Sequence, residues 1–421
     1  MKIKYKSVLG FVIVTALIFV STPISASTVP TTKEMSSNVS ETLVKNVPED
    51  GLKPGTLGGE WTVIALARAE YDEPYIYDSY YNNVAKEVEN DKGILSDYKY
   101  TEYSRVTLGL TAIGRNPRNV GGYDLIQPLA DFSKVEYQGI NGPIWALTAL
   151  DSKNYDMPKL KGTSGIQNSR DIMVNYILSK EAGKGDVSAG GWALAGSFPD
   201  PDITAMAMQA LSKYKSRPDV QAAISRAVNV LSELQNNDGG YSSYGAEDSE
   251  STAQVIVALA GLGIDPCGNN FVKNGHTLIS ALAAYYMPGK GFKHTLSESS
   301  PNSMSTDQCA YALAAYNRFL SEKNPLYDMT DVAPVHRTLE NKAFASDTTS
   351  DFSVKGTYVF KITCKNGNTP DFAIGTPGVF KSYLVKISAG NYYYMIKAVG
   401  HKGAKAGIYI NGPKILVASI C

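Results

Sequence analysis

Carboxylates recur at one place in a repeated phrase of this 421-residue chain. Gly190-Gly191-Trp192 is followed by Asp202-Ile203-Thr204-Ala205, and about 48 residues later Gly239-Gly240-Tyr241 is followed by Glu250-Ser251-Thr252-Ala253. Paired carboxylic acids are suited to general acid and base catalysis, or to hydrogen bonding with a polar ligand. Asp202 and Glu250 are therefore the first candidates for a functional site.

Helical segments rich in alanine and leucine must position these acids. They recur about every 40 to 60 residues, which gives about six units between residues 50 and 325. Residues 220–235 carry one apolar stripe, as an outer helix does, whereas residues 252–262 are apolar almost all round, as a helix buried on both sides is. The pattern predicts a mainly α chain with an (α/α)6 toroid over residues 51–325. An open superhelix of the same hairpins is the alternative.

Closure of the ring would gather the acids. Inner helices of a closed toroid run parallel, so Glu102, Asp202, Glu250 and Asp307, each near the start of such a helix, would surround one mouth. One interpretation is that this ring of acids contacts a ligand, with Trp192, Tyr241 and Tyr244 as aromatic lining; core packing is the other role expected for each of these aromatic residues. Capping is the alternative, because carboxylates at helix starts satisfy backbone N–H groups and complement the helix dipole.

The chain changes character after Leu326. Residues 326–351 are predicted to be a linker, and residues 352–421 a small antiparallel β-sandwich in which Tyr392-Tyr393-Tyr394 forms a packing ladder. Asn411-Gly412 indicates a hairpin turn. A disulfide between Cys364 and Cys421 would join two strands of this domain, but their spacing does not decide whether it forms.

The amino terminus is typical of an exported protein. Residues 1–27 contain three lysines, an apolar stretch of about 13 residues and a small-residue cleavage region, so they are predicted to be a signal peptide. Residues 28–50 are predicted to be a flexible lead-in. Secretion follows, with loose surface attachment as an option and no stable membrane span once the signal is removed.

Composition excludes some partners. The formal charge of the whole chain is zero, which gives no indication of nucleic-acid binding. No Cys/His cluster has metal-ligand spacing, so no metal is expected.

The repeats resemble a known superfamily. Leu231, Gln235, Gly239 and Tyr241 are similar to the Gln-x-x-x-Gly-x-Trp repeat of squalene cyclases and protein prenyltransferases, with tyrosine in place of tryptophan. Residues 200–205 resemble the Asp-x-Asp-Asp-Thr-Ala motif of class II terpene cyclases, which implies Asp202 as general acid beside Asp200. Ile203 stands where that family has a further aspartate.

A second resemblance concerns the order of the domains. A toroid followed by a small β domain is similar to transcobalamin and intrinsic factor, which implies a cobalamin-type ligand between the two parts. Three functions remain open. The preferred one is a secreted, non-catalytic binder of an apolar or corrinoid-like small molecule, with no other cofactor. The alternatives are a class II terpene cyclase and a cell-wall-associated carbohydrate-active protein that contacts a surface glycan through residues 352–421.

Overall fold

The computed structural model describes residues 30–421, except residues 57, 72, 184–188, 334–343, 346–350, 364–368, 377 and 411–413. The predicted signal peptide therefore lies outside the described residues, as do Cys364 and the Asn411-Gly412 turn. None of the helices in the described part of the chain combines the length and apolar character of a membrane span.

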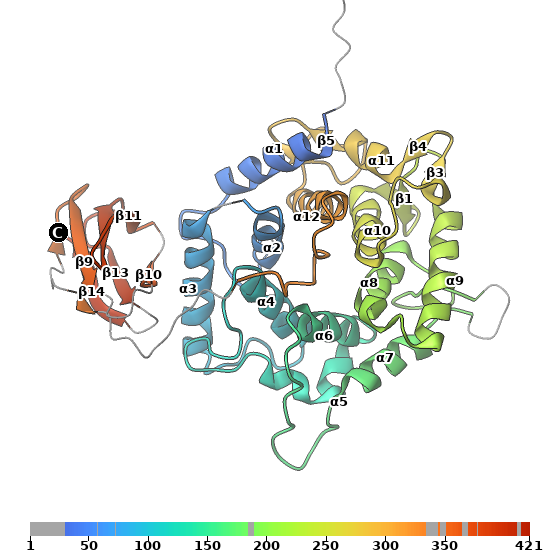
Figure 1. Cartoon of the computed structure of the whole chain (residues 1–421), viewed down its shortest axis with the longest axis horizontal. Helices are drawn as coiled ribbons and strands as arrows, with labels where there is room; N and C mark the ends of the chain where they lie inside the picture. The colour runs from blue at the N-terminus through green and yellow to red at the C-terminus, as the bar shows by residue number, and fades with distance from the viewer. Residues whose placement is uncertain are drawn as a thin grey trace, which may run out of the picture. The chain divides into compact units, whose positions relative to one another are not determined.

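Six helices form an inner ring (Figure 1). They are α2 (Glu60–Arg68), α4 (Thr101–Ala112), α6 (Asn141–Ser152), α8 (Pro201–Leu211), α10 (Ser249–Leu262) and α12 (Ser303–Leu320). Each packs against the next, and α12 packs against α2, so the ring closes on itself. Closure buries α10 from its first residue to Ala260, which confirms the helix predicted to be buried on both sides.

Further helices pack outside this ring. They are α1 (Thr32–Lys45), α3 (Pro74–Asn90), α5 (Phe132–Val135), α7 (Arg170–Ser179), α9 (Pro218–Leu234) and α11 (Leu278–Ala284). Helix α9 buries Val220, Ala223, Ile224, Ala227 and Leu231 along one stripe, which confirms the predicted outer helix.

Short elements connect the helices. The 3₁₀ turns are η1 (Gln127–Ala130), η2 (Glu136–Gln138), η3 (Ser212–Tyr214) and η4 (Asn269–Phe271). Three two-stranded hairpins are β1 (Tyr241–Ser243) with β2 (Ala246–Asp248), β3 (Val272–Lys273) with β4 (His276–Thr277), and β5 (Tyr286–Met287) with β6 (Gly291–Phe292).

The flexible lead-in predicted for residues 28–50 is wrong over helix α1. Thr31 and Glu34 form a capping box at its start, and Met35, Val39 and Leu43 are buried. These apolar residues recur at i, i+4 and i+8, so they share one face of the helix, and α1 packs against α12.

The linker predicted for residues 326–351 is wrong at its start. Leu326, Tyr327 and Met329 are buried in the same core as the ring helices. Two buried arginines, Arg68 at the end of α2 and Arg318 near the end of α12, hold this segment. Residues 324–331 are called the strap below.

Arg68 donates to the carbonyl oxygens of Pro325, Leu326 and Asp328 and pairs with Asp331. Arg318 donates to the Asn324 carbonyl at 2.7 Å and also pairs with Asp331. Positive charges at the carboxyl ends of helices complement the helix dipole. Because both arginines bind the strap, the strap closes the ring where the carboxyl ends of α2 and α12 meet.

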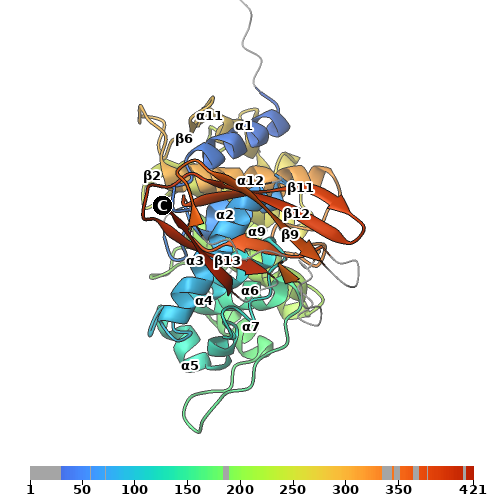
Figure 2. The same cartoon turned by 90° about the vertical axis from the view of Figure 1, so that its left-hand side faces the viewer.

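The β domain consists of two four-stranded sheets (Figure 2). One has the order β11-β12-β9-β7, from β7 (Phe344–Ala345), β9 (Thr357–Thr363), β11 (Phe380–Ser388) and β12 (Asn391–Ala398). The other has the order β10-β13-β14-β8, from β8 (Asp351–Phe352), β10 (Phe372–Ile374), β13 (Lys405–Ile410) and β14 (Lys414–Ile420). The strand pairs of this domain are antiparallel, as predicted, except that the short β8 pairs with β14 in parallel.

A separate apolar core lies between the sheets, with Phe360, Phe380, Ile396 and Ala418 fully buried. Tyr392 is buried in it beside Ile362, whereas its other cross-strand neighbour, Ile387, is 59% exposed, and Tyr393 lies on the opposite face of the sheet.

Candidate functional site at the acidic mouth of the ring

The repeated phrase builds one local structure three times. The backbone N–H of the aromatic residue donates to a threonine hydroxyl of the following inner helix: Trp192 to Thr204 at 2.9 Å, Tyr241 to Thr252 at 3.1 Å, and Phe292 to Thr306 at 3.0 Å. The preceding glycine passes so close to that threonine that a Cβ on Gly291 would lie 2.4 Å from the Thr306 hydroxyl oxygen. The turn therefore fixes where each inner helix begins.

Two aspartates begin α8. Asp200 is its N-cap, and its carboxylate accepts from the backbone N–H groups of Asp202 and Ile203 and from the Ser243 hydroxyl. Capping thus occupies Asp200. The caps of α10 and α12 are Asp248 and Asn302, so the capping alternative is wrong for Glu250 and Asp307.

Four neighbouring helix starts are joined by side-chain contacts around the mouth, from α10 through α12 and α2 to α4. Glu250 of α10 accepts from the Ser305 hydroxyl of α12 at 2.6 Å. Asp307 of α12 accepts from the Thr62 hydroxyl of α2 at 2.6 Å. Glu60 of α2 pairs with Arg105 of α4 at 2.9 Å. We call this part of the mouth the joined sector.

Glu60 was missed by sequence reasoning, although it directly precedes the predicted helix at residue 61. It is fully buried and also accepts from Tyr80 and from the Gly55 backbone N–H. Glu102, a predicted member of the acid ring, pairs with the same Arg105 at 3.0 Å but is more exposed.

His294 adds a titratable group beside Glu250. Its Nδ1 lies 2.9 Å from the Glu250 carboxylate, which raises the pKa of the histidine. Glu250 is thereby bonded on both oxygens, by Ser305 on one and by His294 and Ser249 on the other.

The two remaining inner helices, α6 and α8, lie next to each other and begin differently. Oδ1 of Asp202, in the first turn of α8, is buried without a hydrogen-bond partner. Oδ1 of Asn141, the first residue of α6, is also buried and unpartnered. Neighbouring helix starts thus present two buried acceptors that the described residues leave unsatisfied. We call this part the open sector.

Burial raises the pKa of Asp202 to about 7, and the negative charges of Asp200, Asp248 and Glu250 add to the effect. Burial also raises the pKa of Asp307 to about 7, against the lowering effect of the Thr62 hydroxyl. Both carboxyls therefore hold a proton at mildly acidic pH. Each has a hydroxyl of the next inner helix beside it, Thr62 beside Asp307 and Ser251 beside Asp202, where it lowers the pKa, but Asp202 Oδ1 itself has no hydrogen-bond partner.

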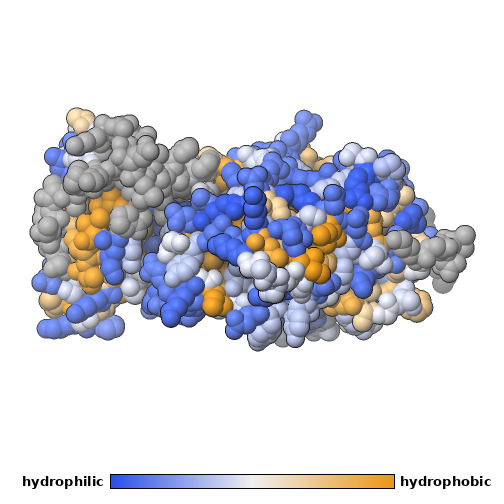
Figure 3. Space-filling model, turned by 90° about the horizontal axis from the view of Figure 1, so that it is seen from below, coloured by the Kyte–Doolittle hydropathy of each residue, from blue (hydrophilic) through white to orange (hydrophobic). Residues whose placement is uncertain are grey.

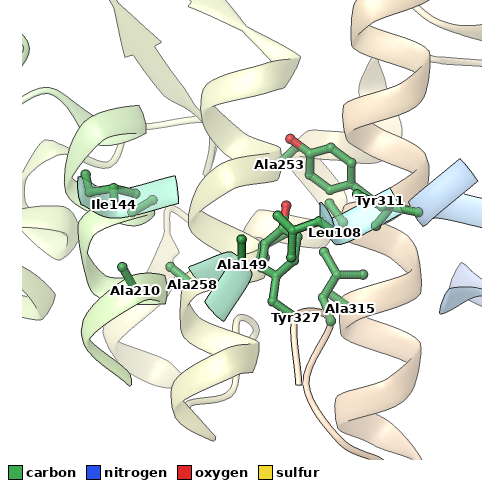
Figure 4. Close-up of a cluster of buried hydrophobic side chains, with 14 of the residues drawn as sticks. Leu108, Ile144, Ala149, Ala210, Ala253, Ala258, Tyr311, Ala315 and Tyr327 are labelled. Carbon is green, nitrogen blue, oxygen red and sulfur yellow. The ribbon is translucent and has the colours of Figure 1, made fainter. Parts of the chain in front are cut away.

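Aromatic side chains meet between the inner helices. The rings of Trp61 and Trp145 are 5.2 Å apart, Tyr311 is 5.9 Å from Trp61, and Tyr327 of the strap is 5.9 Å from Trp145. Figure 4 shows Tyr311 and Tyr327 grouped with small and aliphatic side chains, among them Leu108, Ala149 and Ala315.

Trp61 and Trp145 are only partly buried, unlike Tyr311 and Tyr327. Trp145 follows Asn141 by four residues on α6, so the two share a helix face. Sequence reasoning missed both tryptophans as site residues because neither belongs to the repeated phrase.

Two of the three aromatic residues of the phrase take the core-packing role and not that of ligand lining. Trp192 and Tyr241 are fully buried, and each donates to a backbone carbonyl of the preceding outer helix, Ile177 and Leu231 respectively. They pack between the two helix layers, where no ligand reaches them. Tyr244 has the opposite environment, since it is 88% exposed between β1 and β2.

The opposite end of the ring contains a cavity of about 520 Å³. Its lining includes Thr148, Gln209, Val257 and strap residues Pro325 to Asp328. In the described part of the chain no group of acids, histidines and cysteines has the arrangement of a metal site. Cys267, Cys309 and Cys421 are free thiols, and the predicted disulfide depends on Cys364, which lies outside the described residues.

Fold and site define a closed ring of helices with an acidic, partly aromatic mouth. Residues 144–287 match the family described as the squalene-hopene cyclase C-terminal domain. The match spans both clearest copies of the repeated phrase and confirms the resemblance to the terpenoid cyclase and prenyltransferase α/α-toroid superfamily.

Comparison with curated proteins gives no match. Among solved structures, the chain was compared with Pseudomonas fluorescens alkylpurine DNA glycosylase AlkC bound to DNA containing an abasic site analog. The two are 12% identical, the comparison covers 93% of this chain and 98% of the other, and the TM-score is 0.14. At that TM-score no common fold is demonstrated.

Proposed function

We propose that the chain is a secreted (α/α)6 toroid that binds an amphipathic small molecule at the open sector of its mouth, without catalysis. The observation that carries the proposal is the pair of buried, unpartnered acceptors, Asp202 Oδ1 and Asn141 Oδ1, at the starts of neighbouring inner helices. A buried polar atom without a partner costs free energy, and a ligand that donates to it recovers that cost.

The surroundings of these acceptors define the ligand class. Trp145 shares the face of α6 with Asn141, and Trp61 packs against Trp145, so an apolar body has an aromatic surface to cover. The head group must donate hydrogen bonds, which a hydroxyl or an ammonium group does. The transcobalamin-like domain order implies a corrinoid, which is larger than these ligands and is tested together with them.

Tryptophan fluorescence offers a direct test, because the chain has only three tryptophans and one of them, Trp192, is fully buried. A long-chain amine and a long-chain alcohol should quench Trp61 and Trp145 saturably, and cyanocobalamin tests the corrinoid option. For any probe that quenches the fluorescence saturably, Asp202→Ala should lower the binding affinity about tenfold, as expected when one hydrogen bond to a charged or buried group is lost.

Glu233→Gln, an exposed acid of the outer helix α9, is the matched control and should leave the affinity unchanged. Absence of saturable quenching by every probe, together with empty protein in native mass spectrometry, would sink the binding proposal.

A second candidate is a terpene cyclase with Asp202 as proton donor. Its support is the raised pKa of about 7, which keeps a proton on a carboxyl that carries a free oxygen. Squalene or a polyprenyl diphosphate should then be converted by the wild type and not by Asp202→Asn. A wild-type protein that converts neither substrate removes this candidate. The surface-glycan contact of residues 352–421 stays a prediction.

A further inference from the structure

The β domain and the rest of the chain carry opposite charges. Residues 352–421 contain nine lysines, no arginine and a single acid, Asp371, so their formal charge is +8. Because the whole chain sums to zero, residues 1–351 carry −8. Asp371 is already paired with Arg115 at 3.0 Å. The lysines of this domain therefore have almost no acids of their own to pair with.

The strand register gathers several of these lysines on one face. Lys381 of β11 lies opposite Lys397 of β12, and Lys386 of β11 lies opposite Tyr393, whose other neighbour is Lys361 of β9. Side chains alternate along a strand, and Phe360, Phe380 and Ile396 point into the core, so these lysines share the outer face.

Apolar and aromatic side chains lie between the lysines. Val359, Met395 and Tyr383 form a row across the three strands, and the Lys386 ammonium lies 5.6 Å from the centre of the Tyr393 ring. Tyr383 is 45% and Val359 44% exposed. Figure 3 shows hydrophobic and hydrophilic side chains side by side on the β domain. We call this surface the lysine–tyrosine face.

Protection of a sheet edge explains only part of this pattern. Lysines on the edge strand β11 discourage pairing with another chain. Lys397, however, lies on the inner strand β12 directly opposite Lys381, and like charges in that relation destabilise a sheet. An anion bound across the face relieves this repulsion.

The chemistry of the face selects its partner. Lysine binds phosphate as a point charge, whereas arginine is preferred for planar, bidentate recognition of either carboxylate or phosphate; the domain has no arginine, so its anion is held by charge and not by bidentate geometry. The lysines are spread over three strands and do not converge on one point, which suits a polymer better than a single small anion.

A second copy of the chain is a weaker partner. The acids that gather at the mouth of the ring, Glu60, Glu250 and Asp307, are already bonded within the ring. We propose that the lysine–tyrosine face binds a linear polymer that carries a phosphate on each repeating unit.

The test measures binding of the full chain to long-chain polyphosphate at several salt concentrations. Affinity should fall steeply with salt, because each lysine–phosphate contact releases about one counterion. The triple variant Lys381→Glu, Lys386→Glu and Lys397→Glu should bind at least about tenfold more weakly, and the corresponding glutamine triple should be weakened in the same direction.

The matched control is Lys402→Glu, Lys405→Glu and Lys414→Glu, which makes the same charge change at exposed lysines outside this sheet. It should lose less than about threefold in affinity. Equal losses in the two triples would mean that net charge, not this face, binds the polymer. Tighter binding to polyglutamate, duplex DNA or anionic phospholipid vesicles than to polyphosphate would also overturn the proposal, as would self-association at low salt without polymer binding.

Discussion

The joined and open sectors of the mouth use the same residue types for different ends. In the joined sector, each acid contacts a side chain of the next helix, as Glu250 contacts Ser305 and Asp307 contacts Thr62. In the open sector, Asp202 lies in the first turn of α8 and Asn141 is the first residue of α6, and each keeps a buried oxygen without a hydrogen-bond partner. A side chain at a helix start can therefore keep a free oxygen even where the next repeat supplies a hydroxyl, as Ser251 of α10 does beside Asp202.

Removal of Glu60 should have the largest effect on the joined sector. Glu60→Ala leaves Arg105 and Tyr80 without their buried partner and should lower the free energy of unfolding by about 3–5 kcal/mol. Denaturant unfolding gives the value. Glu102→Ala is the matched control, because it removes the more exposed partner of the same arginine and should cost less than about 1 kcal/mol. Equal costs would contradict the importance assigned to burial.

The stability of the open sector should depend on pH. The raised pKa of Asp202 means that the folded state holds its proton to about pH 7, whereas an unfolded aspartate loses it near its ordinary pKa of 3.8. This contribution to stability is present at low pH and is lost as pH rises from about 4 to 7.

Asp202→Asn removes that loss. The variant should therefore be more stable than the wild type at pH 8, by about 2–4 kcal/mol at one pKa unit per 1.36 kcal/mol, and nearly equal at pH 4. Unfolding curves at pH 4, 6 and 8 measure the difference. A constant offset at all three values would show that the carboxyl is not the titrating group.

A smaller effect is expected where α12 meets α2. Thr62→Val keeps the shape of the side chain but removes the donor to Asp307, so stability should fall by about 1–3 kcal/mol. Thr148→Val is the control, because Thr148 donates only to Ile144 one turn back in its own helix and should cost less than about 1 kcal/mol. Thermal unfolding of both variants would separate a contact between helices from one within a helix.

The smallest effect should come from Tyr244, the exposed aromatic residue of the predicted lining. Tyr244→Ser changes a side chain that is 88% exposed, so its free energy of unfolding should stay within about 0.5 kcal/mol of the wild type. A larger loss in urea unfolding would reveal a packing role that its exposure does not suggest.

Sequence periodicity predicted where the inner helices begin, and hence that Glu250 and Asp307 lie at one mouth. It could not predict the donors, because Ser305 and Thr62 come from other repeats and their approach depends on how neighbouring helices pack. Asn141 and Glu60 escaped notice because they stand outside the repeated phrase.

Composition misled at helix α1. Its serines and threonines resemble those of a flexible segment, but Met35, Val39 and Leu43 carry the helical period that packing requires. The two tryptophans that meet between the inner helices are 84 residues apart, and only closure of the ring brings them together.

The strap also constrains the order in which the chain can fold. Arg68 and Asp331 are separated by 263 residues, so their ion pair forms only after nearly the whole helical region has been synthesised. Contacts of such long sequence separation are slow to form, because closing a long loop costs entropy before the contact contributes any stability. Until the last repeat emerges, the ring is an open arc whose first and last inner helices have an unpaired apolar face. The ion pairs of the strap are therefore among the last contacts of the helical region that can form.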